Sequence, residues 1–476
     1  MSRDEIYNKL LGLLPFDPTD DQEYAIGHIS AFEASTKNNP LYILKGYAGT
    51  GKTTLISTYV RFLQLAGKNF MLLAPTGRAA KVLTKYAGNR AHTIHKHIYT
   101  LITTPDGYNR ILPAHNPSEN TIFLIDEASM INDNSSLGDS LFSARNLLDD
   151  LVNYVYSRKN NKIVLVGDTA QLPPVGLDIS PALNLDYIKS AFDVSAFAFE
   201  MTEVRRQSLD SGILFAATEL RDKIGSQDQT TPFFTTTGFK TDVIRIDNGN
   251  DLEELLNLTF SGREFENGIV VCRTNKRANL FNQQVRNRIL QFENKIEGGD
   301  YLMVVRNNYF WLPDESKAGF IANGDLVKIL RIRKTEELYG FQFADVEIQL
   351  LDYPEEKEIE VKLLLKTLDA DGPGLSTEDQ QLLFNKIEED YSDIPERRKR
   401  VAKMMKDPFL NALHVKFAYA MTCHKTQGGQ WPLVIVDQGY LTDEMINIEY
   451  QRWLYTAITR STDKVYLVNF KDEFFG

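Results

Sequence analysis

At 476 residues the chain is too long for one hydrophobic core, and a usual domain size of about 150 residues predicts roughly three domains. It has no apolar stretch long enough to span a bilayer and no apolar signal core in residues 1–18, so we expect no membrane partner and no export. The net charge of −11 argues against a nucleic-acid partner without excluding one, because binding requires only a local positive groove.

The two cysteines limit which cellular compartment and which kinds of metal or disulfide site the sequence allows. Cys272 and Cys423 are far apart and neither belongs to a C-x-x-C motif. This pattern argues against a zinc site or a disulfide framework and favours a reducing compartment. We therefore expect a cytoplasmic protein.

A glycine-rich turn lies between an apolar run and a helix-like run in residues 41–56. Residues 46–53 match G-x-x-x-x-G-K-[ST] in the strand, turn and helix context that this motif requires. Backbone N–H groups of such a loop cradle phosphates, Lys52 would contact the β- and γ-phosphates, and the Thr53 hydroxyl would complete a Mg²⁺ shell. The alternative is a turn that merely joins two elements. The residues expected to bind nucleotide are Gly46, Ala48, Gly49, Thr50, Gly51, Lys52, Thr53 and Thr54.

Strand-like and helix-like stretches alternate through most of the chain. Apolar strands are expected at 69–76, 121–129 and 162–168, with a helix from about 138 to 156. A second set begins at 268–275 and resumes at 414–428. Continuous apolar strands separated by helices predict parallel sheets covered on both faces, so the fold class is α/β.

The pattern of apolar and polar residues changes between about residue 300 and residue 410. Alternating, turn-punctuated runs predict a small antiparallel β unit, and a helical segment ending in the basic run 396–406 follows. The expected domains are 1–205, then 206–299 with 411–476, and an insertion at 300–410. We expect the acidic stretch with Glu355, Glu356 and Glu358 to repel DNA. The basic run could brace against the hairpin predicted at 98–118 or touch DNA, but a solvated charged face is the preferred interpretation.

Polar side chains follow two of the predicted strands. Asp126 could hold Mg²⁺ and Glu127 could orient the attacking water, although an acidic turn at a strand end is the simpler alternative. Gln171 follows the strand at 162–168 and could sense the γ-phosphate. A connector stiffened by two prolines explains the same residues equally well.

The motifs GYAGTGKTT, APTGRAAKVL, LIDEASMI, VGDTAQLPPVG, TEVRRQ, CHKTQGGQ and YTAITRS occur in the order found in superfamily 1 helicases. These motif sequences resemble those of the RecD-like and Dda-like branch, whose members move 5′ to 3′ on single-stranded DNA. The resemblance implies two RecA-like domains, an SH3-like insertion at 300–410, and ATP with Mg²⁺. It also implies a monomer that acts on single-stranded DNA and duplex junctions in DNA repair, recombination or replication.

The resemblance assigns further residues to the ATP site. Gln22, in TDDQ, is similar to the adenine-recognising element. Arg206 would contact the γ-phosphate, with a one-residue ambiguity because Arg205 is adjacent, and Arg460 would act as an arginine finger from the second domain. Without the family, both would be interpreted as surface arginines.

The resemblance also implies a DNA track. The expected contacts, which follow strands, are Pro75, Thr76, His95, His424, Lys425 and Gln427. Backbone contacts of this kind give affinity without sequence preference. The three histidines at 92, 95 and 97 lack the cysteine or carboxylate expected of a metal site.

Residues 98–118 contain a turn between two strand-like runs, which predicts a hairpin. In the family, a hairpin at this location is a pin that splits the duplex, and Tyr108 offers a stacking face. A solvated hairpin whose tyrosine packs locally is equally compatible with the sequence.

Several functions remain open from the sequence. The expected activity is ATP-dependent 5′ to 3′ DNA unwinding. A DNA-stimulated ATPase that remodels nucleoprotein without unwinding, or an RNA helicase, would carry the same motifs. A P-loop kinase would leave the second-domain motifs without a purpose, and no acid cluster with a lysine indicates a nuclease.

Overall fold

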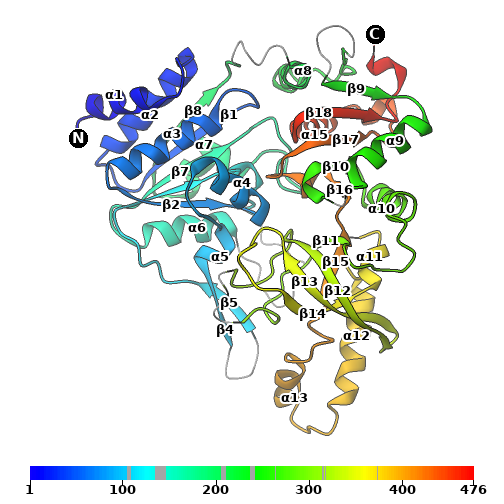
Figure 1. Cartoon of the computed structure of the whole chain (residues 1–476). Helices are drawn as coiled ribbons and strands as arrows, with labels where there is room; N and C mark the ends of the chain where they lie inside the picture. Colours follow the sequence, from blue (N-terminus) through cyan, green and yellow to red (C-terminus); the bar gives the residue numbers. More distant parts are fainter. Residues whose placement is uncertain are drawn as a thin grey trace.

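The computed structural model describes most of the chain, and Figure 1 shows its three parts. The described residues are 1–103, 109–133, 146–204, 211–235, 242–262, 264–313, 316, 318–372 and 374–475, without the side chains of 101–103, 109, 110 and 397. None of the helices in this part of the chain is both long and apolar enough to cross a membrane.

The first domain is built on a parallel sheet of six strands, four of which the apolar runs of the sequence predicted. Their spatial order is β3 (Ala91–Thr93), β2 (Asn69–Ala74), β6 (Thr121–Ile125), β7 (Lys162–Gly167), β1 (Pro40–Gly46) and β8 (Ser195–Met201). Because side chains alternate along a strand, Leu41 and Ile43 face one layer of helices while Tyr42 and Leu44 face the other. Both faces are therefore buried, which explains the continuous apolar strands.

Helices cover both faces of this sheet. One face carries α1 (Arg3–Leu13), α2 (Asp20–Ala34) and α3 (Lys52–Leu65), and the other carries α5 (Ile94–Ile98), α6 (Leu147–Tyr156) and α7 (Leu185–Ala191). α4 (Gly77–Ala87) follows β2 and covers the same face as α1, α2 and α3, where Leu83 and Ala87 are buried. Thr76 caps α4 by accepting the Ala79 N–H. The helix expected from about 138 is described only from Leu147, because 134–145 lie outside the described residues.

The second domain has a parallel sheet of five strands. The order is β16 (Ala420–Thr422), β10 (Gly268–Cys272), β17 (Trp431–Asp437), β18 (Ser461–Val468) and β9 (Val243–Ile246). Its helices are α8 (Gly212–Ser226), α9 (Gly249–Phe260), α10 (Asn275–Gln284), α14 (Cys423–Thr426) and α15 (Ile448–Ile458). The predicted pair of parallel α/β domains is therefore confirmed.

The insertion forms a closed barrel, in agreement with the predicted β unit. Its strands are β11 (Tyr301–Val304), β12 (Leu326–Leu338), β13 (Phe341–Leu350), β14 (Ile359–Leu364) and β15 (Leu413–Phe417). The sequence assigned 414–428 wholly to the resumed parallel sheet, and this is wrong for its first part. β15 pairs with β11 and β14 in the barrel, and the parallel sheet resumes only at β16. The domain boundaries themselves stay a prediction.

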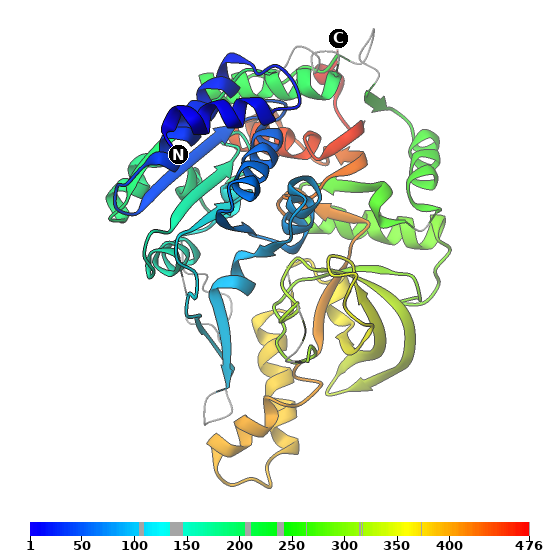
Figure 2. The same ribbon diagram turned by 60° about the vertical axis from the view of Figure 1, so that its left-hand side comes forward.

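The hairpin and the helical extension lie at one end of the molecule (Figures 1 and 2). β4 (Tyr99–Thr103) pairs antiparallel with β5 (Asn109–Pro113), as predicted for residues 98–118, while the tip at 104–108 lies outside the described residues. Beyond β14, the chain forms α11 (Lys366–Asp369), α12 (Thr377–Asp390) and α13 (Arg397–Met404). In α13, Val401 and Met404 are buried and Lys399 is exposed, so the basic run carries a solvated face.

The barrel shares its hydrophobic core with the second domain. One continuous cluster contains Val270 of β10, Leu302 of β11 and Val346 of β13. The first-domain sheet has separate clusters on its two faces. The barrel is therefore joined to the second domain by apolar packing.

The barrel meets the first domain through charged side chains instead. Lys96 Nζ lies 3.4 Å from Asp325 Oδ2 and 4.1 Å from the centre of the Tyr353 ring. Arg90 Nη2 lies 3.0 Å from Glu355 Oε1. Part of the acidic stretch that was expected to repel DNA therefore lies against basic residues of the first domain.

Asp352 is an unsatisfied acid at this interface. Neither of its carboxylate oxygens has a hydrogen-bond partner among the described residues. Burial raises the pKa of Asp352 to about 6, although Arg78 opposes the shift. Because the pKa in the fold lies above the usual value of 3.8, the ionised carboxylate destabilises the fold. This penalty is complete above about pH 6 and decreases as the pH falls toward the usual value.

We expect Asp352→Asn to raise the melting temperature by roughly 5 °C at about pH 7.5 and by much less at about pH 5. Thermal unfolding followed by circular dichroism at both pH values measures the difference. Glu358→Gln is the matched control, because Glu358 is exposed on the same barrel and should leave the melting temperature unchanged. An equal rise at both pH values would contradict the assignment to Asp352 ionisation.

Candidate active site and nucleic-acid interface

A cavity of about 650 Å³ lies between the two sheet domains. The first domain contributes the loop after β1 and the ends of β6 and β7, and the second domain contributes the end of α15. Predicted site residues that line this cavity are Ala48, Gly49, Gly51, Lys52, Thr53, Asp126, Glu127, Gln171 and Arg460. Residues far apart in the sequence thus meet in one site.

The phosphate loop has the backbone that its glycines predict. Gly51 has φ of 90°, in the left-handed region, and a Cβ atom there would collide with the Gln22 amide. Lys52 is the first residue of α3, and its Nζ donates to the carbonyl oxygens of Gly46 and Tyr47, the latter at 2.8 Å. The ammonium group is therefore held at the mouth of the loop.

Gln22 supports the loop from behind. Its Nε2 donates to the Thr50 carbonyl at 3.0 Å, and its Oε1 accepts the Thr19 N–H at 3.2 Å. Gln22, Gly46, Thr50 and Thr54 do not line the cavity. Adenine recognition by Gln22 stays a prediction, because in this arrangement its amide holds the loop.

The two acids after β6 are buried in the cavity. The Tyr86 hydroxyl donates to Asp126 Oδ2, a contact that no sequence pattern indicated. Glu127 Oε1 lies 3.9 Å from Arg460 Nη1. Burial raises the pKa of Asp126 and raises that of Glu127 to about 7, against the opposing charge of Arg460.

These residues fit a magnesium ion. Mg²⁺ prefers hard oxygen ligands, and the Thr53 hydroxyl and the Asp126 carboxylate both face the same cavity as the phosphate loop. A buried carboxylate whose pKa is raised is also stabilised by a nearby cation. Thr53 and Asp126 are therefore the residues that would hold Mg²⁺, which would neutralise charge on the phosphates.

Gln171 lies between the ATP cavity and a neighbouring cavity of about 340 Å³. Its Oε1 is buried and has no hydrogen-bond partner within the described ranges. An amide oxygen in this position can accept a hydrogen bond from a water molecule. Arg452 of α15 fixes the backbone on either side by donating to the Thr169 and Gln171 carbonyls.

Most of the face that α15 presents to the first domain was not predicted from the sequence. Arg452, Tyr455, Thr456, Thr459 and Arg460 lie at helical spacing, and each contacts the first domain or lines the ATP cavity. The signal was present as hydrophilic residues recurring every three or four positions in an otherwise apolar helix. Arg206, and its neighbour Arg205, lie outside the described residues.

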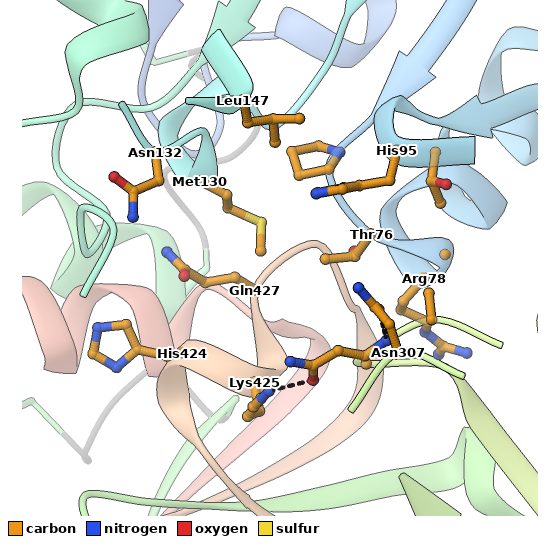
Figure 3. A pocket seen from close by; sticks show the side chains of 16 residues that line it. Thr76, Arg78, His95, Met130, Asn132, Leu147, Asn307, His424, Lys425 and Gln427 are labelled. Atoms are coloured by element: carbon orange, nitrogen blue, oxygen red, sulfur yellow. Dashed lines mark hydrogen bonds between the residues drawn. The ribbon is translucent and has the colours of Figure 1, made fainter. Parts of the chain in front are cut away.

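A second cavity, of about 390 Å³, is shared by all three parts of the chain (Figure 3). The first domain supplies Pro75, Thr76, Arg78 and His95, the second domain His424, Lys425 and Gln427, and the barrel Asn307 and Asn323. All the predicted DNA contacts within the described residues therefore line one groove. Tyr108 lies outside the described residues. No sequence pattern indicated the two barrel asparagines.

Burial disfavours the charged forms of three basic side chains in the groove. Burial lowers the pKa of His95 to about 4 and also lowers the pKa values of His424 and Lys425. Lys425 Nζ donates to Asn323 Oδ1 at 2.8 Å. His95 is therefore a neutral hydrogen-bonding group, and Lys425 is a cation whose burial makes an anionic partner favourable.

The neighbouring histidines have a packing role. The His97 ring lies 5.6 Å from the Tyr154 ring and 6.1 Å from the Phe123 ring, centre to centre. His92 lies 6.2 Å from His97. Within the described residues no group of three or more His, Cys, Asp or Glu side chains is arranged to hold a metal.

A phosphate loop, two acids at the end of β6 and an arginine from a second parallel-sheet domain define a two-domain P-loop ATPase. Residues 20–230 match the AAA domain family, and residues 417–468 match the UvrD-like helicase C-terminal domain family. With the relatives described next, these matches support a superfamily 1 helicase of the Dda-like and RecD-like group.

Two curated proteins are similar to this chain in sequence. The ATP-dependent DNA helicase dda of Enterobacteria phage T4 is 26% identical over 461 residues, which cover 89% of this chain and 93% of that protein. The ATP-dependent RecD2 DNA helicase of Deinococcus radiodurans is 32% identical over 180 residues, covering 37% of this chain and 21% of that protein. A solved structure of two coordinating Pif1 helicases at forked double-stranded DNA is 14% identical, covering 97% of this chain and 94% of that chain, with a TM-score of 0.48.

Proposed function

We propose that this ATP-hydrolysing helicase acts on DNA, moving 5′ to 3′ on a single strand and separating the duplex ahead of it. The observation that carries the proposal is the pairing of two cavities, the ATP site and the groove, each lined by both sheet domains. The direction is supported by the motif resemblance to the Dda-like branch. Work in DNA repair, recombination or replication is supported by the same resemblance.

The ATP site supplies the groups that hydrolysis requires. The phosphate loop and Lys52 bind the phosphates, Glu127 orients the attacking water, and Arg460 stabilises charge on the transferred phosphoryl group. Thr53 and Asp126 would hold Mg²⁺, which would neutralise phosphate charge. Because Arg460 and Lys52 lie in different domains, binding of the γ-phosphate draws the domains together and hydrolysis releases them.

A short backbone segment joins the ATP site to the groove. Gln171 lines the ATP cavity, and the next residue, Leu172, accepts a hydrogen bond from Gln427 Nε2 at 2.7 Å. Gln427 lines the groove. The Leu172 N–H donates to Thr456 Oγ1 at 2.8 Å, which holds the segment against α15. A change at the γ-phosphate can therefore reach the groove through one peptide unit.

We expect Gln427→Ala to reduce the stimulation of ATP hydrolysis by single-stranded DNA by about tenfold, within the usual range of coupling energies. Hydrolysis without DNA should stay within about twofold of the unsubstituted chain, because Gln427 does not line the ATP cavity. Phosphate release at increasing DNA concentration measures both quantities.

Gln438→Ala is the matched control for this substitution. Gln438 is also buried in the second domain, but its Nε2 donates to the Tyr450 hydroxyl within the same domain. If Gln438→Ala reduced DNA stimulation as strongly as Gln427→Ala, the contact with Leu172 would not be the coupling path.

The proposed function is tested by strand displacement on two duplexes, one with a 5′ single-stranded tail and one with a 3′ tail. We expect ATP-dependent displacement of the 5′-tailed duplex alone, and its loss in Lys52→Ala. Displacement of the 3′-tailed duplex instead would overturn the direction. Hydrolysis stimulated by DNA without displacement of either would identify a remodelling ATPase, and preference for RNA tails would identify an RNA helicase.

We also place the chain in the reducing environment of the cytoplasm. Cys272 and Cys423 are both free and buried, and burial raises the pKa of each thiol. Thiols of this kind are packing groups and need no oxidising compartment.

A further inference from the structure

Tyr455 is a fully buried residue on the face of α15 that meets the first domain. Its hydroxyl accepts the Ala48 N–H at 2.8 Å and donates to Asp168 Oδ2 at 2.6 Å. Both partners belong to the first domain, whereas α15 belongs to the second. One hydroxyl group therefore joins two first-domain groups from across the domain boundary.

Both partners are next to the phosphate-binding groups. Ala48 belongs to the phosphate loop and lines the ATP cavity. Asp168 follows β7, lines the same cavity and lies with its Oδ2 4.0 Å from Lys52 Nζ. The other oxygen of Asp168 accepts the Ala170 N–H at 2.9 Å, so this carboxylate also shapes the turn that leads to Gln171.

The hydroxyl stays protonated in this environment. Burial raises the pKa of Tyr455 well above its ordinary value, and the nearby charge of Asp168 acts in the same direction. A protonated phenol can donate to Asp168 while it accepts from Ala48, which is the arrangement observed.

We propose that Tyr455 is a positioning residue for ATP hydrolysis, whose hydroxyl fixes the Ala48 amide and the Asp168 carboxylate only when the two domains are together. This role is distinct from that of Arg460, because Tyr455 is not among the residues that line the ATP cavity and acts through residues that do. The inference rests on the ATP hydrolysis described above. It does not depend on DNA unwinding or on its direction.

The role requires the hydroxyl and not the ring. Phenylalanine would fill the same space, but it would leave the Ala48 N–H and one Asp168 oxygen without their partner. Buried donors and carboxylates left unpaired are costly, and the loop and the turn would shift to find other partners. Small displacements of groups that hold a reacting phosphate reduce the rate strongly.

The test compares Tyr455→Phe with Tyr450→Phe. Tyr450 is a buried tyrosine on the same helix, but its hydroxyl accepts from Gln438 within the second domain. We expect Tyr455→Phe to lower kcat for ATP hydrolysis by about tenfold to a hundredfold, with KM for ATP changed less than about threefold. Tyr450→Phe should leave both within about twofold.

A double-substitution cycle with Asp168→Asn adds a second readout. If the hydroxyl acts through Asp168, the loss of kcat in the double variant will be smaller than the product of the two single losses. Circular dichroism melting checks that each variant is folded at the assay temperature.

Three results would overturn the proposal. One is an unchanged kcat in Tyr455→Phe, and another is a rise in KM alone, which would make the hydroxyl a binding group. A third is strict multiplication of the two losses in the cycle. Failure of strand displacement with normal hydrolysis would count against the proposed function and leave this inference standing.

Discussion

Replacing Arg460 with alanine is expected to lower kcat for ATP hydrolysis by roughly a thousandfold or more, while ATP still binds. The Arg460 side chain is buried and fixed, because its Nε donates to the Thr456 carbonyl at 3.0 Å and its Nη2 to Thr459 Oγ1 at 3.4 Å. It faces the phosphate loop across the ATP cavity. A guanidinium group held in this way stabilises charge that develops only in the transition state.

The measurement is phosphate release at saturating ATP with single-stranded DNA, together with titration of a fluorescent ATP analogue. Arg288→Ala is the control, because Arg288 is an exposed arginine of the same domain. A kcat within threefold of that of the unsubstituted chain would show that Arg460 is not the finger. An equal loss of nucleotide affinity would make Arg460 a ground-state binding group.

Replacing Glu127 with glutamine is expected to lower kcat by roughly 10²- to 10⁴-fold, the usual contribution of a positioned base. Glutamine keeps the size of the side chain and the backbone at φ of 52°, but it cannot take up a proton. Because Arg460 Nη1 lies 3.9 Å from Glu127 Oε1, the substitution also removes the anion beside the arginine. We expect ATP to remain bound and strand displacement to be lost.

Single-turnover hydrolysis separates this chemical defect from slow product release. Glu119→Gln is the control, because Glu119 is an exposed glutamate of the first domain. Nearly normal single-turnover hydrolysis in Glu127→Gln would assign the water-orienting role to another group, and Gln171, with its unpartnered amide oxygen, would be the next candidate.

The parts of the site that lie on one contiguous segment were predictable. The phosphate loop is a local structure, because its conformation depends on glycines a few residues apart and on the helix that begins at Lys52. Asp126 and Glu127 were predictable for the same reason, since they directly follow a buried strand. Short or half-buried strands were missed, including β3, β8 and β9. β3 has only three residues, an arginine interrupts β9, and β8 is half-buried along most of its length.

The assignment of 414–428 shows a different limit. All five residues of β15 are buried, including His414 and Lys416, and a short buried strand of this kind is equally compatible with a parallel sheet or with a barrel. Only its partners decide between them, and these are β11 and β14. The residue pattern of a strand indicates that both of its faces are buried, but it does not indicate which strands pair with its edges.

The amino-acid sequence alone predicted two parallel-sheet domains, the phosphate loop and the acids Asp126 and Glu127. It also predicted the family that the motifs resemble. Those features repeat within a strand, a turn or a helix, where covalent neighbours decide the conformation. The pairs Tyr455 with Ala48, Gln427 with Leu172 and Lys425 with Asn323 were settled only by the packing of domains. Hydrogen bonds between groups a hundred or more positions apart have no local pattern, because they depend on the relative placement of whole domains.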